Sequence, residues 1–246
     1  MRRYVILGSL LVILCGATIW MTSLGSVGIF KVAPPGKVLG EALRHLQIVA
    51  VAEGFAILIG IPVGFLVTRR ALRFISPLLI GIANIGQTIP TLAFIAMAAL
   101  ALGMGFEAAV VALAAYTVLP IIRNTYAGIR SVDPAVREAA QGMGMSKWQI
   151  TLRVELPLAR PVIMAGIRTS TVVNVGTAAV AGMIGAGGLG AIIMSGIAVR
   201  VTAIVIQGAA PTAALAVVLD AILAKAEDWT TPRGLKVLKL AQWQAQ

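Results

Sequence analysis

The polar side chains best placed to do chemistry lie inside otherwise apolar stretches of the sequence. Ser170, Asn174 and Thr177 are spaced i, i+4 and i+7, which places them on one stripe of a helix. Asn84 and Thr88 form a second pair with i, i+4 spacing. Such hydroxyl and amide groups can line a path for a polar solute, or they can hydrogen-bond to neighbouring helices. The spacing leaves both alternatives open.

Glu53 is a carboxylate within another apolar stretch. An acidic group at such a position is costly to bury and usually faces protein or water. It could attract a cationic solute, bond to a neighbouring span, or be held in its protonated form. We group Glu53 with the five neutral polar residues as a candidate translocation path.

The same inventory argues against catalysis by this chain. It has one cysteine and one histidine, Cys15 and His45, too few for a Cys/His metal site. No G-x-x-x-x-G-K-[ST] sequence is present, so no nucleotide-binding loop is predicted. We therefore expect a chain that is not an enzyme and binds no metal or cofactor itself. His45 is expected to be an interfacial residue, and the stretch 185–190 a hinge with close helix packing.

The composition explains where these residues must sit. Of 246 residues, 59% are hydrophobic and 12% are charged, and the mean hydropathy is +0.96. Nine acidic and 20 basic residues cannot cover a soluble globule of this size. The composition predicts an all-α integral membrane protein. The net charge of +11 could suggest nucleic acid as a partner, but its distribution along the chain indicates membrane orientation instead.

Long charge-free stretches predict about six transmembrane helices. They lie near residues 4–21, 46–67, 78–102, 106–123, 162–184 and 201–223. The third contains Gly81, Gly86 and Pro90, which predicts a broken or strongly tilted helix.

With the N-terminus inside the cell, all but four of the 20 basic residues fall on the cytoplasmic side. The positive-inside rule therefore places both termini in the cytoplasm. Arg2-Arg3 before an apolar run also fits a cleaved signal peptide. An uncleaved first span is favoured because it keeps the later spans in register with the charge bias.

The cytoplasmic loop 131–160 is polar, basic and too long for a plain connector. Asp133 can cap a helix that has Pro134 at its first position, and Gly142 and Gly144 can end that helix. The segment after it predicts a second helix.

Ser146 and Gln149 have the spacing of a capping box at the start of this second helix. Pro157 is expected to stop the same helix. The loop is thus predicted to be a helical hairpin. A hairpin of this kind could also lie passively on lipid headgroups.

Three parts of this loop carry a family resemblance. Glu138-Ala139-Ala140 is followed after three residues by Gly144, and after nine more by Val154-Glu155-Leu156-Pro157. The pattern resembles the EAA loop of ABC importer permeases, with every spacing matched. The resemblance implies that the loop couples the permease to a cytoplasmic ABC ATPase, which binds ATP-Mg. The ATPase-coupling residues carried over are Glu138, Ala139, Ala140, Gly144, Leu156 and Pro157.

Two further segments, 86–91 and 175–190, resemble the osmoprotectant subgroup of these permeases, which imports glycine betaine, choline or carnitine. The resemblance implies a permease of the bacterial inner membrane whose partners are the ATPase, an extracytoplasmic binding protein, a second or sibling permease and membrane lipid, but no nucleic acid. Methionine or phosphonate importers are the alternative within the class. An ion-driven secondary transporter is the alternative outside it.

The resemblance also implies a division of the chain. Residues 1–39 are expected to form the first span and an extracytoplasmic linker, residues 40–225 the permease core, and residues 226–246 a cytoplasmic tail. The 13 aromatic residues are scattered, which argues against an aromatic cage for quaternary ammonium inside the spans. Tight recognition is therefore expected from the separate binding protein.

Overall fold

The computed structural model describes two long stretches of the chain, residues 33–72 and 74–230, and a few positions before them. Those earlier positions are Ile13, Gly16, Trp20, Ser26, Val27, Phe30 and Lys31. The expected first span, 4–21, therefore lies outside the described residues except for three helical positions. The tail expected beyond residue 230 also lies outside them.

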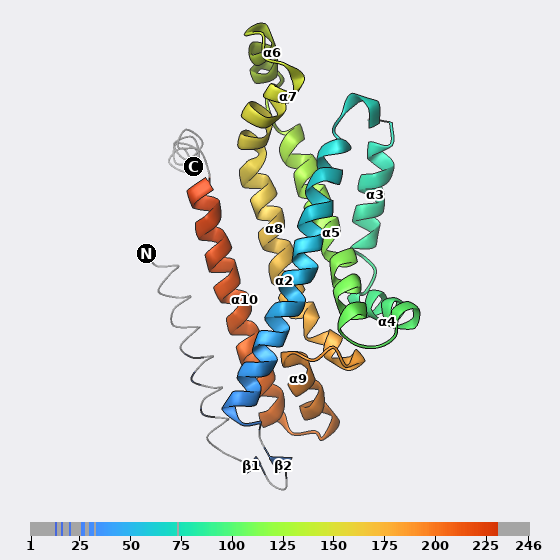
Figure 1. The fold of residues 1–246 in the computed structure, drawn as a ribbon, viewed down its shortest axis with the longest axis vertical. Coiled ribbons are helices and arrows are strands. Elements are labelled where there is room, and N and C mark those ends of the chain that lie inside the picture. Colours follow the sequence, from blue (N-terminus) through green and yellow to red (C-terminus); the bar gives the residue numbers. More distant parts are fainter. Residues whose placement is uncertain are drawn as a thin grey trace. The chain divides into compact units, whose positions relative to one another are not determined.

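The described chain is helical apart from a two-stranded antiparallel pair (Figure 1). The elements in chain order are β1 (Ser26–Val27), β2 (Phe30–Lys31), α2 (Pro35–Leu66), α3 (Ser76–Gly86), α4 (Thr91–Leu102), α5 (Phe106–Arg130), α6 (Pro134–Gly142), α7 (Lys147–Ile150), α8 (Leu156–Ala178), α9 (Leu189–Ala198) and α10 (Thr202–Thr230). Short 3₁₀ turns cover Arg70–Leu72 and Val180–Ile184, and a π-turn covers Thr151–Glu155.

Among the described residues, α2, α5 and α10 are long and apolar enough to cross a membrane, and α3 with α4 forms a broken fourth candidate. The predicted break within 78–102 is confirmed, because the chain leaves helical geometry between Gly86 and Thr91. The span predicted near 162–184 differs at its C-terminal end, since α8 stops at Ala178 and a 3₁₀ turn covers Val180–Ile184. The count of six spans and the side of each terminus stay predictions.

The long helices each contain an interior proline: Pro62 in α2, Pro120 in α5, Pro161 in α8 and Pro211 in α10. Proline removes one backbone donor, and membrane helices tolerate this where neighbouring groups satisfy the freed carbonyl. Prolines inside these segments therefore did not end the helices.

The described chain divides into two compact units. In the first unit, residues 88–118 and 170–221 pack with the N-terminal part up to Ala56, around a core that includes Ile48, Ile95, Leu113 and Val175. In the second unit, residues 57–87 and 119–169 pack with the described residues from 222 to 230. Its core is built on Ile129, Ala159, Ile163 and Ile167.

The glycine-rich stretch at 185–190 is a site of close backbone packing, as predicted. Gly185, Gly187 and Gly188 have positive φ angles, and Gly188 precedes the first residue of α9. A Cβ at Gly190 would overlap the carbonyl of Ala179, so only glycine lets α9 approach that segment. The helix α9 itself was not predicted, because a ten-residue apolar run is too short to read as a span.

Candidate functional site

The first helix of the cytoplasmic loop forms as its local sequence predicts. The Asp133 carboxylate accepts a hydrogen bond from the backbone N–H of Ala135 over 2.8 Å, and Pro134 occupies the first turn of α6. The helix ends at Gly142, and Gly144 adopts a φ of +79°. Positive φ is the region that glycine enters without a steric penalty, so Gly144 makes the turn of the hairpin.

The second helix of the loop has the predicted capping box. The Ser146 hydroxyl accepts from the Gln149 N–H over 3.3 Å, and the Gln149 side chain accepts from the Ser146 N–H over 2.8 Å. The prediction that Pro157 ends this helix is wrong. The chain continues from α7 through the π-turn into α8. In that wider turn the Leu156 N–H bonds to the Thr151 carbonyl, so Pro157 falls in the first turn of α8, where proline is tolerated.

Some residues of the EAA pattern are exposed on the hairpin, and others are buried or half-buried. Glu138 and Ala139 are exposed on α6, and Gly144 is exposed at the turn. Ala140 is buried beneath them, while Leu156 and Pro157 are half-buried at the start of α8. The exposed residues are accessible to a partner protein, whereas Ala140, Leu156 and Pro157 help to hold the hairpin in place.

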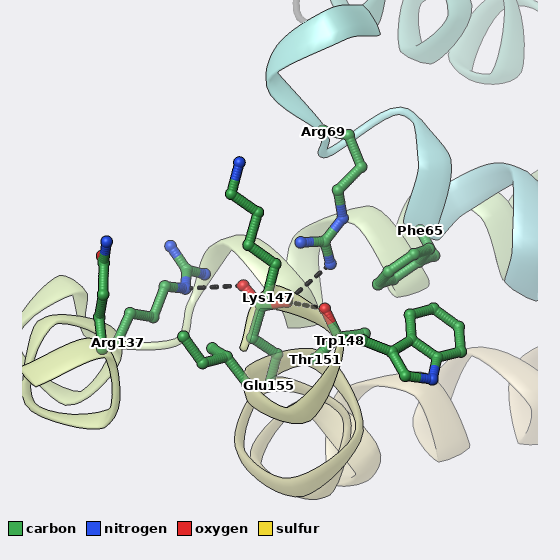
Figure 2. Close-up of a pocket in the computed structure, with 9 residues that line it drawn as sticks. Phe65, Arg69, Arg137, Lys147, Trp148, Thr151 and Glu155 are labelled. Carbon is green, nitrogen blue, oxygen red and sulfur yellow. Dashed lines mark hydrogen bonds and ion pairs between the residues drawn. The ribbon is translucent and has the colours of Figure 1, made fainter. Parts of the chain in front are cut away.

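Glu155, the position of the pattern that any residue may fill, is contacted by two arginines and a threonine (Figure 2). One carboxylate oxygen accepts from Arg69 over 2.6 Å and from the Thr151 hydroxyl over 3.3 Å. The other lies 3.0 Å from the guanidinium of Arg137. Arg137 also donates to the carbonyl of Ile129 near the end of α5. The Arg69–Glu155–Arg137 group, called the carboxylate clamp below, therefore joins four segments of the second unit.

A pocket of about 480 Å³ opens beside the clamp. It is lined by Phe65, Arg69, Arg137, Gln141, Lys147, Trp148, Ile150, Thr151 and Glu155. The guanidinium of Arg69 lies over the Phe65 ring at 3.9 Å from its centroid. Stacking on the ring fixes the direction in which Arg69 reaches the carboxylate.

Sequence reasoning did not single out the three clamp residues. Glu155 offered a signal, because it is an acidic residue between Val154 and Leu156 at the start of an apolar helix. Its partners lie 86 and 18 positions earlier in the chain, and no local periodicity connects them.

The predicted translocation-path residues are only partly brought together. In the first unit, the Asn174 amide on α8 donates to Glu53 on α2 over 3.0 Å, with both side chains buried. Ser170, one turn earlier on α8, is fully buried and donates to the carbonyl of Thr117. Of the three alternatives for Glu53, the geometry favours the bond to a neighbouring helix.

The other three path candidates have different surroundings. The Thr177 hydroxyl donates within its own helix, to the carbonyls of Val173 and Asn174. Asn84 on α3 and Thr88 just beyond it are exposed. The stripe on α8 thus divides into the buried Ser170 and Asn174 and the half-buried Thr177, while the second pair, Asn84 and Thr88, is exposed.

His45 corrects another prediction. It was expected at the membrane interface, yet it is fully buried on α2 and its Nε2 lies 3.0 Å from the carbonyl of Val175. A Cβ at Gly188 would lie 3.1 Å from the His45 Cα, so the glycine stretch provides the space for it. In the described part of the chain, no three His, Cys, Asp or Glu side chains gather as metal ligands would.

The comparison with known families decides what kind of protein this is. Residues 60–230 match the family described as the binding-protein-dependent transport system inner membrane component. This chain belongs to that family. As a family member it is a multi-pass permease of the inner membrane, and the relatives are transport components rather than enzymes.

Similar permeases with assigned solutes cover most of the chain. The carnitine transport permease protein OpuCD of Listeria monocytogenes is 44% identical over 196 residues, which is 79% of this chain and 87% of OpuCD. The choline transport system permease protein OpuBB of Bacillus subtilis is 44% identical over 83% of this chain and 93% of its own. The osmoprotectant import permease protein OsmY of Salmonella typhimurium is 46% identical over 74% and 77%.

Solved structures agree on the fold of the permease. An inward-facing form of the MetNI methionine ABC transporter aligns with a TM-score of 0.64 at 27% identity, over 78% of this chain and 93% of that one. An amino acid ABC transporter crystallised with histidines aligns with a TM-score of 0.61 at 21% identity, over 79% and 92%. The helical architecture described above is therefore that of ABC importer permeases.

Proposed function

We propose that this permease is the translocation subunit of an ATP-driven importer for osmoprotectants such as glycine betaine, choline or carnitine. The observation that carries the proposal is the 44–46% identity to permeases named for carnitine, choline and osmoprotectant transport. Methionine is the second candidate solute, supported by the 27% identical structural relative. The lower identity places methionine second.

In this proposal, ATP-Mg is bound and hydrolysed by a separate cytoplasmic ATPase. The α6–α7 hairpin provides the docking element, since Glu138 and Ala139 are exposed on it. Glu138 would make polar contacts, and Ala139 would permit close approach. Closure of the ATPase would displace the hairpin and switch the permease between its two access states. A second copy or a sibling permease and an extracytoplasmic binding protein complete the importer.

The proposed path suits a solute that has a fixed positive charge. A trimethylammonium group must lose water on entry, and neutral hydroxyl and amide groups offset that cost without trapping the solute as a salt bridge would. Thr88, Asn84 and Thr177 are the exposed or half-buried polar residues that could line such a path. Ser170, Asn174 and Glu53 would support it from within the protein. Solute selection belongs to the binding protein.

Uptake by reconstituted vesicles tests the proposed solute. The permease is co-purified with its ATPase and binding protein, and radiolabelled betaine, choline, carnitine and methionine are offered separately. ATP inside the orientation-matched vesicles is expected to drive uptake of at least one quaternary ammonium solute, and omission of the binding protein should abolish it. Uptake of methionine alone would reject the solute class and leave the permease assignment standing.

We further propose the complete topology of six spans, with both termini, the hairpin and residues 226–246 in the cytoplasm, and residues 1–39 forming the first span and an outer linker. Single cysteines at Lys37 and Met143, in a Cys15→Ser background, test the orientation. Both side chains are exposed, and Met143 lies outside the capping box. An impermeant thiol reagent applied to intact cells should label position 37 only. Labelling of position 143 in intact cells would reverse the topology, and permeabilised cells should label both.

A further inference from the structure

The carboxylate clamp lies where the α6–α7 hairpin meets the ends of the long helices. Arg69 comes just after α2, Arg137 lies on α6, and Glu155 ends the π-turn that leads into α8. Arg137 also donates to the carbonyl of Ile129 near the end of α5. One carboxylate therefore connects the exposed hairpin to three of the long helices, within a single compact unit.

The three charges of the clamp depend on one another. The side chain of Glu155 is 7% exposed, whereas those of Arg69 and Arg137 are 34% and 30% exposed. Each arginine contacts a different oxygen of the carboxylate, so neither can substitute for the other. Replacing Glu155 leaves two cations facing each other without a counter-charge. Replacing either arginine, each of which is one arm of the clamp, leaves part of the buried carboxylate charge unpaired. The clamp is thus a buried carboxylate paired with two arginines, not an exposed ion pair.

The π-turn places Glu155 in this position. Its Leu156 N–H bonds five residues back to Thr151, and this wider turn aligns Glu155 with the Thr151 hydroxyl on the same inward face. Wide turns of this type often occur where a helix carries a functional side chain. The helix continues from α7 through this turn into α8.

We propose that Glu155 is a positioning residue for energy coupling, which holds the α6–α7 hairpin to the ends of α2, α5 and α8 so that displacement of the hairpin moves these helices together. The inference rests on the proposed function, because it requires that an ATPase displaces the hairpin. Glu155 is buried and does not contact the ATPase in this assignment. Its loss should separate ATP hydrolysis from transport, not the ATPase from the permease.

The test measures solute moved per ATP hydrolysed by the complete importer in vesicles. Glu155→Gln keeps the shape and removes the charge, and Arg69→Gln and Arg137→Gln each remove one arm. Arg123→Gln, the same change at an exposed arginine of α5, is the matched control. Each clamp variant is expected to keep the ATPase bound and hydrolysing while transport per ATP falls by about tenfold. The control should match the wild type.

A double variant shows whether Arg137 and Glu155 act through one shared contact or weaken transport independently. If both arms act through Glu155, adding Arg137→Gln to Glu155→Gln should cause little further loss, whereas independent effects would multiply. An unchanged ratio of transport to hydrolysis in the single variants, or multiplying losses in the doubles, would overturn the proposal. If Glu155→Gln does not accumulate, Arg137→Gln provides the same measurement because Glu155 keeps Arg69.

The solute used is the one that the wild-type importer moves. An error in the proposed solute class therefore becomes visible in the wild type, before any variant is compared. An error in the clamp assignment becomes visible only in the variants.

Discussion

Replacing Gly144 with valine is expected to abolish solute uptake while the permease remains in the membrane. Gly144 turns the hairpin with a φ of +79°, and a β-branched residue in that conformation is strained by roughly 1–3 kcal/mol. No atom lies within 4 Å of where a Cβ would stand, so the cost comes from the backbone and not from a clash. The hairpin should relieve this strain by changing its turn, which displaces the exposed face of α6. Uptake and ATPase co-purification are the measurements.

Two further substitutions separate backbone strain from a simple change of volume. Gly144→Asn should retain most of the uptake, because asparagine tolerates the left-handed region better than other residues with a Cβ. Gly142→Val adds the same side chain two residues earlier, where φ is not positive and no neighbour lies within 4 Å. It should transport nearly normally. Equal losses at both glycines would show that bulk on the hairpin, not the turn, causes the defect.

Replacing Asn174 with leucine is expected to lower both the stability and the uptake rate of the permease. Leucine has a similar size but cannot donate to Glu53, which would stay buried with one hydrogen-bond donor fewer. Leaving a buried polar group without a hydrogen-bond partner costs about 1–3 kcal/mol. Thermal unfolding of the purified permease in detergent measures the first effect, and vesicle uptake measures the second. The solute affinity of the isolated binding protein should not change.

A double variant distinguishes a purely structural pair from a role in the solute path. In Glu53→Leu with Asn174→Leu both members of the pair are replaced, so neither is left buried without the other and part of the lost stability should return. If the pair also supports the path, uptake stays roughly tenfold below the wild type despite the recovered fold. Recovery of both stability and uptake would remove Glu53 and Asn174 from the proposed path.

Local sequence was sufficient to predict the features that short-range physics controls. Asp133 and Ser146 cap their helices, and Gly144 turns the hairpin, because each acts on backbone groups within a few residues. The apolar runs likewise predicted long helices and the break after Gly86, because helix length and hydropathy are local quantities. The spacing of the loop residues also identified the permease class before the fold was known.

The tertiary structure decided what depends on distant partners. The outcome at Pro157 is an exception, because it depends on the π-turn directly before it, in which Leu156 bonds five residues back to Thr151. His45 is buried rather than interfacial because Gly188 leaves room for it and Val175 offers a carbonyl, 130 residues away. Glu155 is separated from Arg69 by 86 residues, so only folding could bring the carboxylate between two arginines. Helix formation follows from neighbouring residues, whereas the pairing of buried polar groups follows from which helices meet.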